Sequence, residues 1–169
     1  MTRALALAAV LLLSACATTE APPPAPTQAG PPTQEQWDAL QASWLAWNGQ
    51  KRGWSSTDSG LQYRRVGKAN PSGAQPKATD VVKVHYRGTF IDGREFDSSY
   101  SRNEPAEFPL NRVIKGWTEG LQLMRTGETF DFAIPGDLAY GNRWVGGGEI
   151  PPNSTLLFRV ELLEVKPAA

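Results

Sequence analysis

The side chains that could perform covalent or acid–base chemistry are too few to form a standard catalytic arrangement. The chain has one cysteine, Cys16, and one histidine, His85. A single cysteine excludes an internal disulfide and a multi-cysteine zinc site, and a single histidine excludes a histidine-rich metal site. The sequence contains neither a Gly-x-Ser-x-Gly nucleophile motif nor a Walker loop. Any activity must therefore depend on apolar surface, a few polar groups and shape, which favours a reaction without a hard bond cleavage.

His85 lies in a segment of alternating apolar and polar residues. In an extended strand this spacing places it on the face opposite Val84 and Tyr86. We interpret it as a hydrogen-bonded structural residue rather than a catalyst. Cys16 lies close to the N-terminus, so a Cys–His catalytic pair is also disfavoured.

The length and the charge of the chain indicate the broad class of protein. The chain has 169 residues, with 17 lysines and arginines balanced by 17 aspartates and glutamates. This length predicts one domain with room for tails at either end. A balanced charge without long acidic or basic blocks disfavours a general nucleic-acid binder.

Residues 1–16 have the features of an export signal. A basic Arg3 is followed by ten apolar residues at 4–13. As a helix, such a segment would be about 15 Å long. It has about half of the ~20 residues that a helix needs to span a bilayer. We therefore interpret it as a signal-peptide core rather than a permanent transmembrane helix, with a buried N-terminal helix as the less favoured alternative given the charged start. Residues 13–16, LSAC, resemble a bacterial lipobox, which implies acylation of Cys16, and Ala17 resembles the outer-membrane sorting pattern. Ordinary cleavage with an unmodified cysteine is the alternative.

Residues 17–32 are interpreted as a disordered spacer. Six prolines and one charged residue cannot supply enough apolar surface for order. Sixteen semi-extended residues could reach about 50 Å. A proline ligand for another protein is the less favoured alternative.

A short helix is predicted next. Thr33 and Gln36 have the spacing of a capping box, and Gly49 would end the helix. Large apolar residues then recur on one helical face: Trp37, Leu40, Trp44 and Trp47. We expect this face to pack on the domain that follows. The alternative is a dimer interface or a surface that binds client proteins.

The remainder of the chain is dominated by strand patterns. Apolar residues alternate at 82–86, 130–134 and 156–162, and Asp92-Gly93 marks a tight turn. One helical pattern interrupts them, at Trp117, Leu121 and Met124. The predicted fold is α+β: an antiparallel sheet forming a half-barrel around one short helix, with a short N-terminal helix.

Several segments of this domain resemble, in the same order, those of FKBP-type peptidyl-prolyl isomerases. They are VKVHYRG at 82–88, DGREFDSS at 92–99, VIKGWTEGL at 113–121, IP at 134–135, LAYG at 138–141 and IPPNSTL at 150–156. The resemblance covers residues 60–166. NGQK at 48–51, before SGLQY at 59–63, resembles the envelope branch related to the macrophage infectivity potentiator.

The resemblance implies a proline-binding pocket. Trp117 would form its floor, and Tyr140 would donate a hydrogen bond to a substrate carbonyl. Asp97 would lie at the pocket edge. The family's catalytic positions correspond to Tyr86, Phe96, Asp97, Trp117 and Tyr140, and its other substrate-binding positions to Val113, Ile114, Ile150 and Phe158. No metal or organic cofactor is implied.

Two segments depart from the family pattern. Ala106 stands where many members have an aromatic wall, which should open one side of the pocket. Phe108 is interpreted as structural, and the alternative is that it compensates for the missing ring. The segment 142–149 lacks a histidine that is common in eukaryotic relatives. Its three glycines predict a flexible flap. Both differences bear on substrate preference and on macrolide affinity.

The physical chemistry of the X–Pro bond suits such a pocket. The trans form is preferred by only about 0.5–1 kcal/mol, whereas the rotation barrier is about 18–20 kcal/mol. A dry apolar pocket that favours the twisted amide needs no nucleophile. The sequence therefore predicts a prolyl isomerase that assists the folding of exported proteins. The alternatives are a non-catalytic chaperone or peptide-binding module, and a structural lipoprotein.

The chain is accordingly divided into a lipoprotein signal (1–16), a tether (17–32), a helix with linker (33–59) and an isomerase domain (60–166). The expected partners are unfolded proline-containing polypeptides, macrolide inhibitors and a membrane bound through the lipid anchor, without nucleic acid. The expected location is the bacterial envelope, on the periplasmic side of the outer membrane. The short N-terminal helix favours a monomer.

Overall fold

The computed structural model describes residues 30–168. The predictions for the export signal, Cys16 and most of the tether therefore concern residues outside the described part. The elements, in chain order, are α1 (Gln34–Gly49), β1 (Ser55–Ser56), β2 (Gln62–Val66), β3 (Val81–Thr89), β4 (Glu95–Ser98), β5 (Ala106–Pro109), η1 (Leu110–Arg112), α2 (Lys115–Leu121), β6 (Thr129–Ile134), η2 (Gly136–Leu138) and β7 (Leu156–Lys166).

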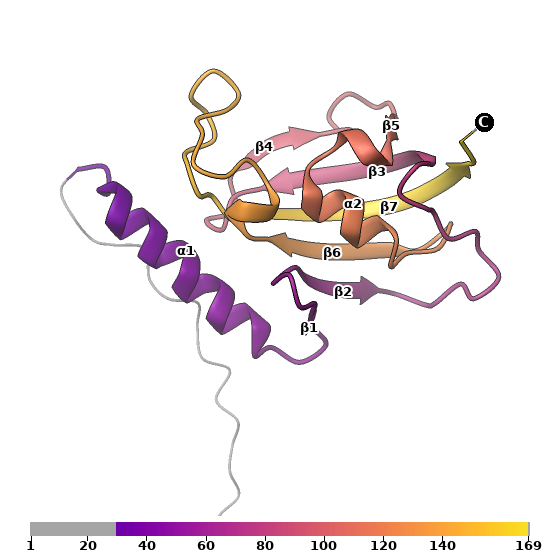
Figure 1. The fold of residues 1–169 in the computed structure, drawn as a ribbon, viewed down its shortest axis with the longest axis horizontal. Coiled ribbons are helices and arrows are strands. Elements are labelled where there is room, and N and C mark those ends of the chain that lie inside the picture. The colour runs from indigo at the N-terminus through magenta and orange to yellow at the C-terminus, as the bar shows by residue number, and fades with distance from the viewer. Residues whose placement is uncertain (1–29, 169) are drawn as a thin grey trace, which may run out of the picture.

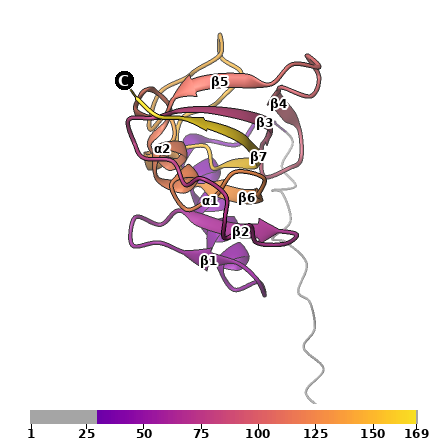
Figure 2. The ribbon, with the colours of Figure 1, turned by 90° about the vertical axis from the view of Figure 1, so that its right-hand side faces the viewer.

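The strands form one antiparallel sheet in the order β1-β2-β6-β7-β3-β4, and β5 also pairs with β3. The two central strands, β3 and β7, are the longest. The helix α2 lies against one face of this sheet (Figure 1), and the view turned by 90° shows it on one side of the strands (Figure 2). The predicted α+β fold is confirmed.

Alternation along the strands builds the core. Val82, Val84 and Tyr86 are buried on the face of β3 that meets α2, and β7 buries alternate residues from Leu156 to Leu162 in the same way. The turn predicted at Asp92-Gly93 joins β3 to β4, and Gly93 has φ +89°. The glycine suits this turn because side chains disfavour positive φ.

A glycine also allows α2 to lie close to the sheet. At Gly120, an added Cβ would lie 2.7 Å from Cε1 of Phe132 on β6. A larger residue would push the helix outward. The neighbouring Trp117 and Leu121 are buried on the same side of α2.

The helix α1 begins with the predicted capping box and ends at Gly49. It contacts β2 and the segment that leads into β7, and its most buried face is turned from the predicted one. Its buried residues are Gln41, Trp44 and Asn48, so Trp44 alone belongs to the predicted apolar stripe. Trp37, Leu40 and Trp47 are half-buried.

Polar contacts explain this shift of face. Asn48 donates a hydrogen bond of 2.8 Å to the side-chain oxygen of Gln62 on β2. The backbone N–H of Thr155 donates one of 3.0 Å to the side chain of Gln41. The prediction that the stripe packs on the domain is therefore correct for Trp44, while hydrogen bonds determine how the helix is turned.

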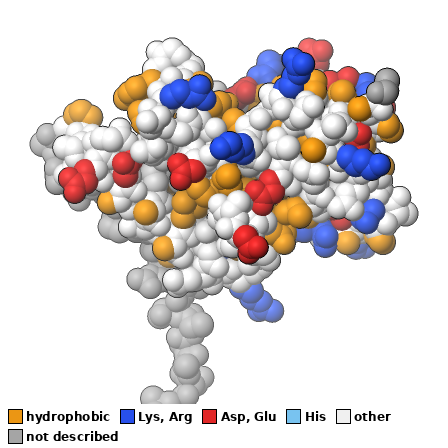
Figure 3. All heavy atoms as spheres, in the orientation of Figure 1, with side chains coloured by type: hydrophobic (Ala, Val, Ile, Leu, Met, Phe, Trp, Pro, Cys, Tyr) orange, Lys and Arg blue, Asp and Glu red, His pale blue; other side chains and the backbone are white. Residues whose placement is uncertain are grey.

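Acidic and basic side chains are interspersed over the face shown in Figure 3, and apolar ones gather near its centre. This mixture agrees with the balanced composition. Among residues 30–168, no helix is both long enough and apolar enough to cross a bilayer.

Candidate functional site

A cavity of about 300 Å³ lies between α2, the inner face of the sheet and the loops beside it. We refer to it as the aromatic cavity. Its walls are mainly rings and aliphatic chains. The residues that line it are Tyr86, Phe96, Asp97, Phe108, Arg112, Val113, Ile114, Trp117, Tyr140 and Phe158.

Trp117 is the centre of this arrangement. It lies in the first turns of α2 and is 4% exposed. Tyr86, Phe108 and Phe158 meet its indole nearly edge-on, with ring centroids 5.2, 5.7 and 5.3 Å away. Edge-to-face packing of this kind stabilises aromatic clusters beyond the area that they bury. The indole is thus held rigidly by rings from three strands.

Strand register brings the walls together. Gly88 on β3 stands opposite Phe158 on β7. An added Cβ at Gly88 would lie 2.7 Å from Cζ of Phe96 and 2.9 Å from Cε1 of Phe158. These two rings also pack edge-on, at 5.5 Å. The missing side chain at position 88 therefore provides the space that both rings occupy.

Charged groups gather at one edge of the cavity. The Tyr86 hydroxyl donates to Oδ2 of Asp97 at 2.5 Å. Arg102 donates to the other carboxylate oxygen at 2.5 Å and to the Tyr86 oxygen at 2.9 Å. Burial raises the pKa of Asp97, but the hydrogen bonds from Tyr86 and Arg102 outweigh it and hold that pKa below its usual value. Asp97 is therefore an ionised carboxylate whose two oxygens both have donors.

Tyr140 carries a hydroxyl that remains available. Burial, with a smaller effect from the charge of Asp97, raises the pKa of Tyr140. The phenol is therefore protonated at neutral pH. Within residues 30–168, its hydroxyl has no hydrogen-bond partner. It can donate to a carbonyl that enters the cavity.

The structure brings together all the predicted site residues of the described chain except Ile150. Ile150 is 6% exposed and belongs to the core, where it forms a bridge with Val145. That bridge closes the glycine-rich flap, in which Gly146, Gly147 and Gly148 all have positive φ. The flap glycines thus form a tight turn.

Sequence reasoning missed three residues of the site. Phe108 was expected to be structural, but it lines the cavity. Phe108 lies two residues after Ala106 on β5, so the two side chains share one face of the strand. This spacing could have indicated that Phe108 forms the cavity wall expected at Ala106. Arg112, in η1, and Arg102, in the loop after β4, carry no periodic signal. His85, in contrast, lies outside the cavity, hydrogen-bonded to Ser99 at 2.9 Å.

The site residues can bind an apolar group and orient a carbonyl. Among residues 30–168, no cluster of His, Cys, Asp and Glu could hold a metal ion. The arrangement offers a rigid apolar hollow, one free hydroxyl donor and one fixed carboxylate.

Residues 72–163 match the family described as FKBP-type peptidyl-prolyl cis-trans isomerase. A relative from Aeromonas hydrophila, "FKBP-type peptidyl-prolyl cis-trans isomerase FkpA", is 59% identical over 127 residues, which are 75% of this chain and 46% of the relative. "Outer membrane protein MIP" of Legionella longbeachae is 47% identical over 135 residues, 80% of this chain and 57% of that protein. The chain thus spans about half the length of these curated relatives.

The crystal structure of FkpA from Escherichia coli superposes with a TM-score of 0.74 at 45% identity. The superposition covers 80% of this chain and 62% of that one. At this identity the likeness covers the sequence as well as the fold.

Proposed function

Because this chain belongs to the family of FKBP-type peptidyl-prolyl cis-trans isomerases, we propose that it accelerates rotation about X–Pro bonds in polypeptides. The observation that carries the proposal is the aromatic cavity, with Trp117 at its base and the free hydroxyl of Tyr140 at its side. Its volume of about 300 Å³ suits one proline ring with the preceding residue.

Catalysis would come from differential binding. Resonance holds the amide planar, and the twisted amide at the top of the barrier has lost that conjugation and is less polar across C–N. Rings and aliphatic chains solvate such a state better than water does. A pocket that binds the twisted amide more strongly than the planar one lowers the barrier without a covalent step.

Each residue has a part in this scheme. The proline ring would pack on Trp117, between Tyr86 and Phe158, while Phe96, Phe108, Val113 and Ile114 enclose it. Tyr140 would donate a hydrogen bond to a carbonyl of the substrate. Ile150 would act indirectly, by holding the flap beside Tyr140 through its bridge to Val145.

Asp97 would act as a fixed negative charge at the edge of the cavity. Both of its oxygens accept hydrogen bonds from Tyr86 and Arg102, so the carboxylate cannot turn freely. Because these donors hold its pKa low, it stays ionised at neutral pH. We propose that it interacts with the amide region of the substrate rather than exchanging protons with it.

The test is an isomerisation assay with the full chain and proline tetrapeptides that carry Leu, Ala or Glu before proline. We expect catalysis above the uncatalysed rate, inhibition by a macrolide, and a preference for Leu because the walls are apolar. An equal or Glu-favouring profile would contradict the expected preference. A rate equal to that of buffer would instead favour a peptide-binding module without catalysis.

We further propose that the protein is exported and anchored through acylated Cys16, and that it assists the folding of exported polypeptides as a monomer. The apolar segment and lipobox of residues 1–16 support this location. Fractionation of cells that express wild type or Cys16→Ser tests the anchor, because the substitution should release the protein from the membrane fraction. Sedimentation in detergent tests the monomer.

A further inference from the structure

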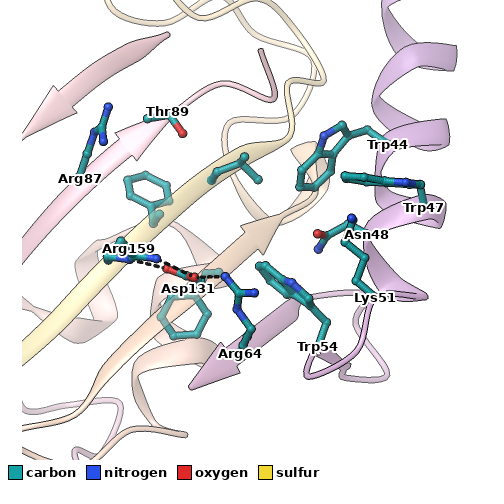
Figure 4. Close-up of a pocket in the computed structure, with 13 residues that line it drawn as sticks. Trp44, Trp47, Asn48, Lys51, Trp54, Arg64, Arg87, Thr89, Asp131 and Arg159 are labelled. Atoms are coloured by element: carbon teal, nitrogen blue, oxygen red, sulfur yellow. Dashed lines mark hydrogen bonds and ion pairs between the residues drawn. The ribbon is translucent and has the colours of Figure 1, made fainter. Parts of the chain in front are cut away.

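A second cavity lies between α1 and the outer face of the sheet, on the side away from α2 (Figure 4). Its volume is about 430 Å³, and Phe158 is the one residue that also lines the aromatic cavity. We refer to it as the tryptophan cavity. One wall consists of Trp44, Trp47 and Trp54, and charged side chains from the strands form the other.

The charged side chains form a row across four neighbouring strands. Arg64 on β2 is the register partner of Asp131 on β6, and Asp131 is the partner of Arg159 on β7. Arg159 in turn stands opposite Arg87 on β3. Neighbouring strands lie about 4.8 Å apart, so the row is about 14 Å long. It contains three guanidinium groups and one carboxylate.

Asp131 neutralises only part of this row. Its two oxygens accept hydrogen bonds of 2.6 Å from Arg64 and 2.7 Å from Arg159. Arg87 pairs with Glu95 at the end of the row, at 2.8 Å. Although burial raises the pKa of Asp131, the two arginines hold it below its usual value. The carboxylate is therefore already occupied, while the side chains of Arg64 and Arg159 remain 40% and 54% exposed.

Lys51 adds a further positive charge. Its ammonium lies 3.6 Å from the centroid of the Trp47 ring, and it has no ion-pair partner within residues 30–168. The lining thus carries four cations, Lys51 and the three arginines, against Asp131. The positive excess remains when Glu95 is included.

The indoles provide the apolar part. The rings of Trp44 and Trp47 lie 5.8 Å apart, and Arg64 lies 5.1 Å from the ring of Trp54. Trp47 and Trp54 are half-buried, so part of each ring faces the opening. Half-exposed indoles beside arginines can bind apolar and anionic groups together.

We propose that the tryptophan cavity binds an extended acidic polypeptide segment. Its carboxylates would pair with the arginine row, and an aromatic or aliphatic side chain would lie among the indoles. The length of the row equals that of four or five extended residues at about 3.3 Å each. One small carboxylate would be too short to span it. The positive excess supplies the complementary charge. Because this chain has no long acidic block, a second copy suits the row poorly. The site needs neither proline nor isomerase activity.

Calorimetric titration of the full chain, in a non-ionic detergent, tests the proposal. The probe is a capped, proline-free peptide, DFEDFED, and its neutral counterpart NFQNFQN is the control. We expect the acidic peptide to bind at least about tenfold more tightly and to lose affinity as salt is raised, because ion pairing with exposed arginines is screened.

Matched variants locate the site. Lys51→Glu should weaken binding about fivefold or more, since it reverses a charge in the lining. Arg52→Glu makes the same change one residue along, on an exposed side chain outside the lining, and should have little effect. Trp54→Ala should weaken binding, whereas Trp144→Ala, at a tryptophan 62% exposed on the flap, should not. An unchanged midpoint of urea unfolding for Lys51→Glu shows that the fold is intact.

Several results would overturn the proposal. They are equal affinity for the two peptides, equal losses for Lys51→Glu and Arg52→Glu, self-association that Lys51→Glu abolishes, and binding to phosphatidylglycerol vesicles without peptide binding. Failure of the isomerase assay alone would leave this proposal standing, because the peptide contains no proline.

Discussion

The two cavities lie on opposite faces of one sheet and are built from neighbouring residues of opposite character. Tyr86 and Phe158 line the aromatic cavity, while Arg87 and Arg159, the next residues in the chain, line the tryptophan cavity. The walls of the first cavity are rings that pack edge-on, whereas the second is lined partly by charged side chains in ion pairs.

This difference shows how one sheet can carry two kinds of binding surface. Successive side chains on a strand point to opposite faces, so each strand contributes to both. Close packing stabilises the inner face, where changing one ring disturbs the rings that contact it. Solvated charge dominates the outer face, where single contacts contribute less. The two faces should therefore respond differently to mutation and to pH.

The largest contrast should come from the tryptophans. We expect Trp117→Ala to lower the free energy of unfolding by about 3–5 kcal/mol, because its buried indole supports three rings. Isomerase activity should fall to background. Trp54→Ala, at a half-buried indole, should cost about 1 kcal/mol or less. Urea unfolding of the two variants measures the difference, and equal losses would show that the faces are not packed differently.

Acidification should reveal the ion pair of the outer face. Because the pKa of Asp131 is lowered in the folded state, its contribution is complete above the unfolded value of about 3.9. It is lost as pH falls through the lower folded-state pKa. Asp131→Asn should therefore be less stable than wild type by about 1–2 kcal/mol near neutral pH, with the gap closing in strong acid.

Urea unfolding from about pH 6 to pH 3, a range that brackets the usual aspartate pKa, measures this dependence. Asp58→Asn is the matched control, since Asp58 is exposed and takes no part in the ion pairs of the described residues. A gap between Asp131→Asn and wild type that persists or widens in acid would show that Asp131 does not stabilise the fold as a carboxylate.

A smaller effect is expected from the free hydroxyl of the inner face. Tyr140→Phe should lower kcat/KM by about three- to tenfold, as the loss of one hydrogen bond to the substrate would. Its thermal stability should hardly change, because that hydroxyl has no partner among the described residues. Tyr100→Phe removes an exposed hydroxyl that contacts Glu161 and should leave the rate unaltered. Equal rates for wild type and Tyr140→Phe would exclude the proposed donor.

The smallest effect concerns the edge of the aromatic cavity. Arg102→Gln removes one of the donors that hold the pKa of Asp97 low, so that pKa should rise. We expect kcat/KM to fall about two- to threefold at neutral pH, as for an exposed ion pair, and the acid limb of its pH profile to move upward. Arg94→Gln breaks the exposed pair with Asp92 and serves as the control. An unmoved acid limb would mean that Asp97 does not influence the reaction.

Much of the fold could be predicted because its signals are local. The alternation of apolar residues located β3, β6 and β7, and the Asp92-Gly93 dipeptide located the turn after β3. Ordered motifs placed Trp117 and Tyr140 in one cavity. For α1, spacing predicted a helix with the correct cap and a buried Trp44. The most buried face is nevertheless turned towards Gln41 and Asn48, because their hydrogen bonds orient the helix.

The local pattern by itself determined which strand residues alternate between the two faces of the sheet and where α1 begins, because these features depend on neighbours in the chain. The tertiary structure decided that Phe108 completes a wall, that Arg102 reaches Asp97, and that Arg64, Asp131, Arg159 and Arg87 form one row. These contacts depend on the register between strands distant in sequence. That register is set by how the whole sheet pairs and packs, which no single segment encodes.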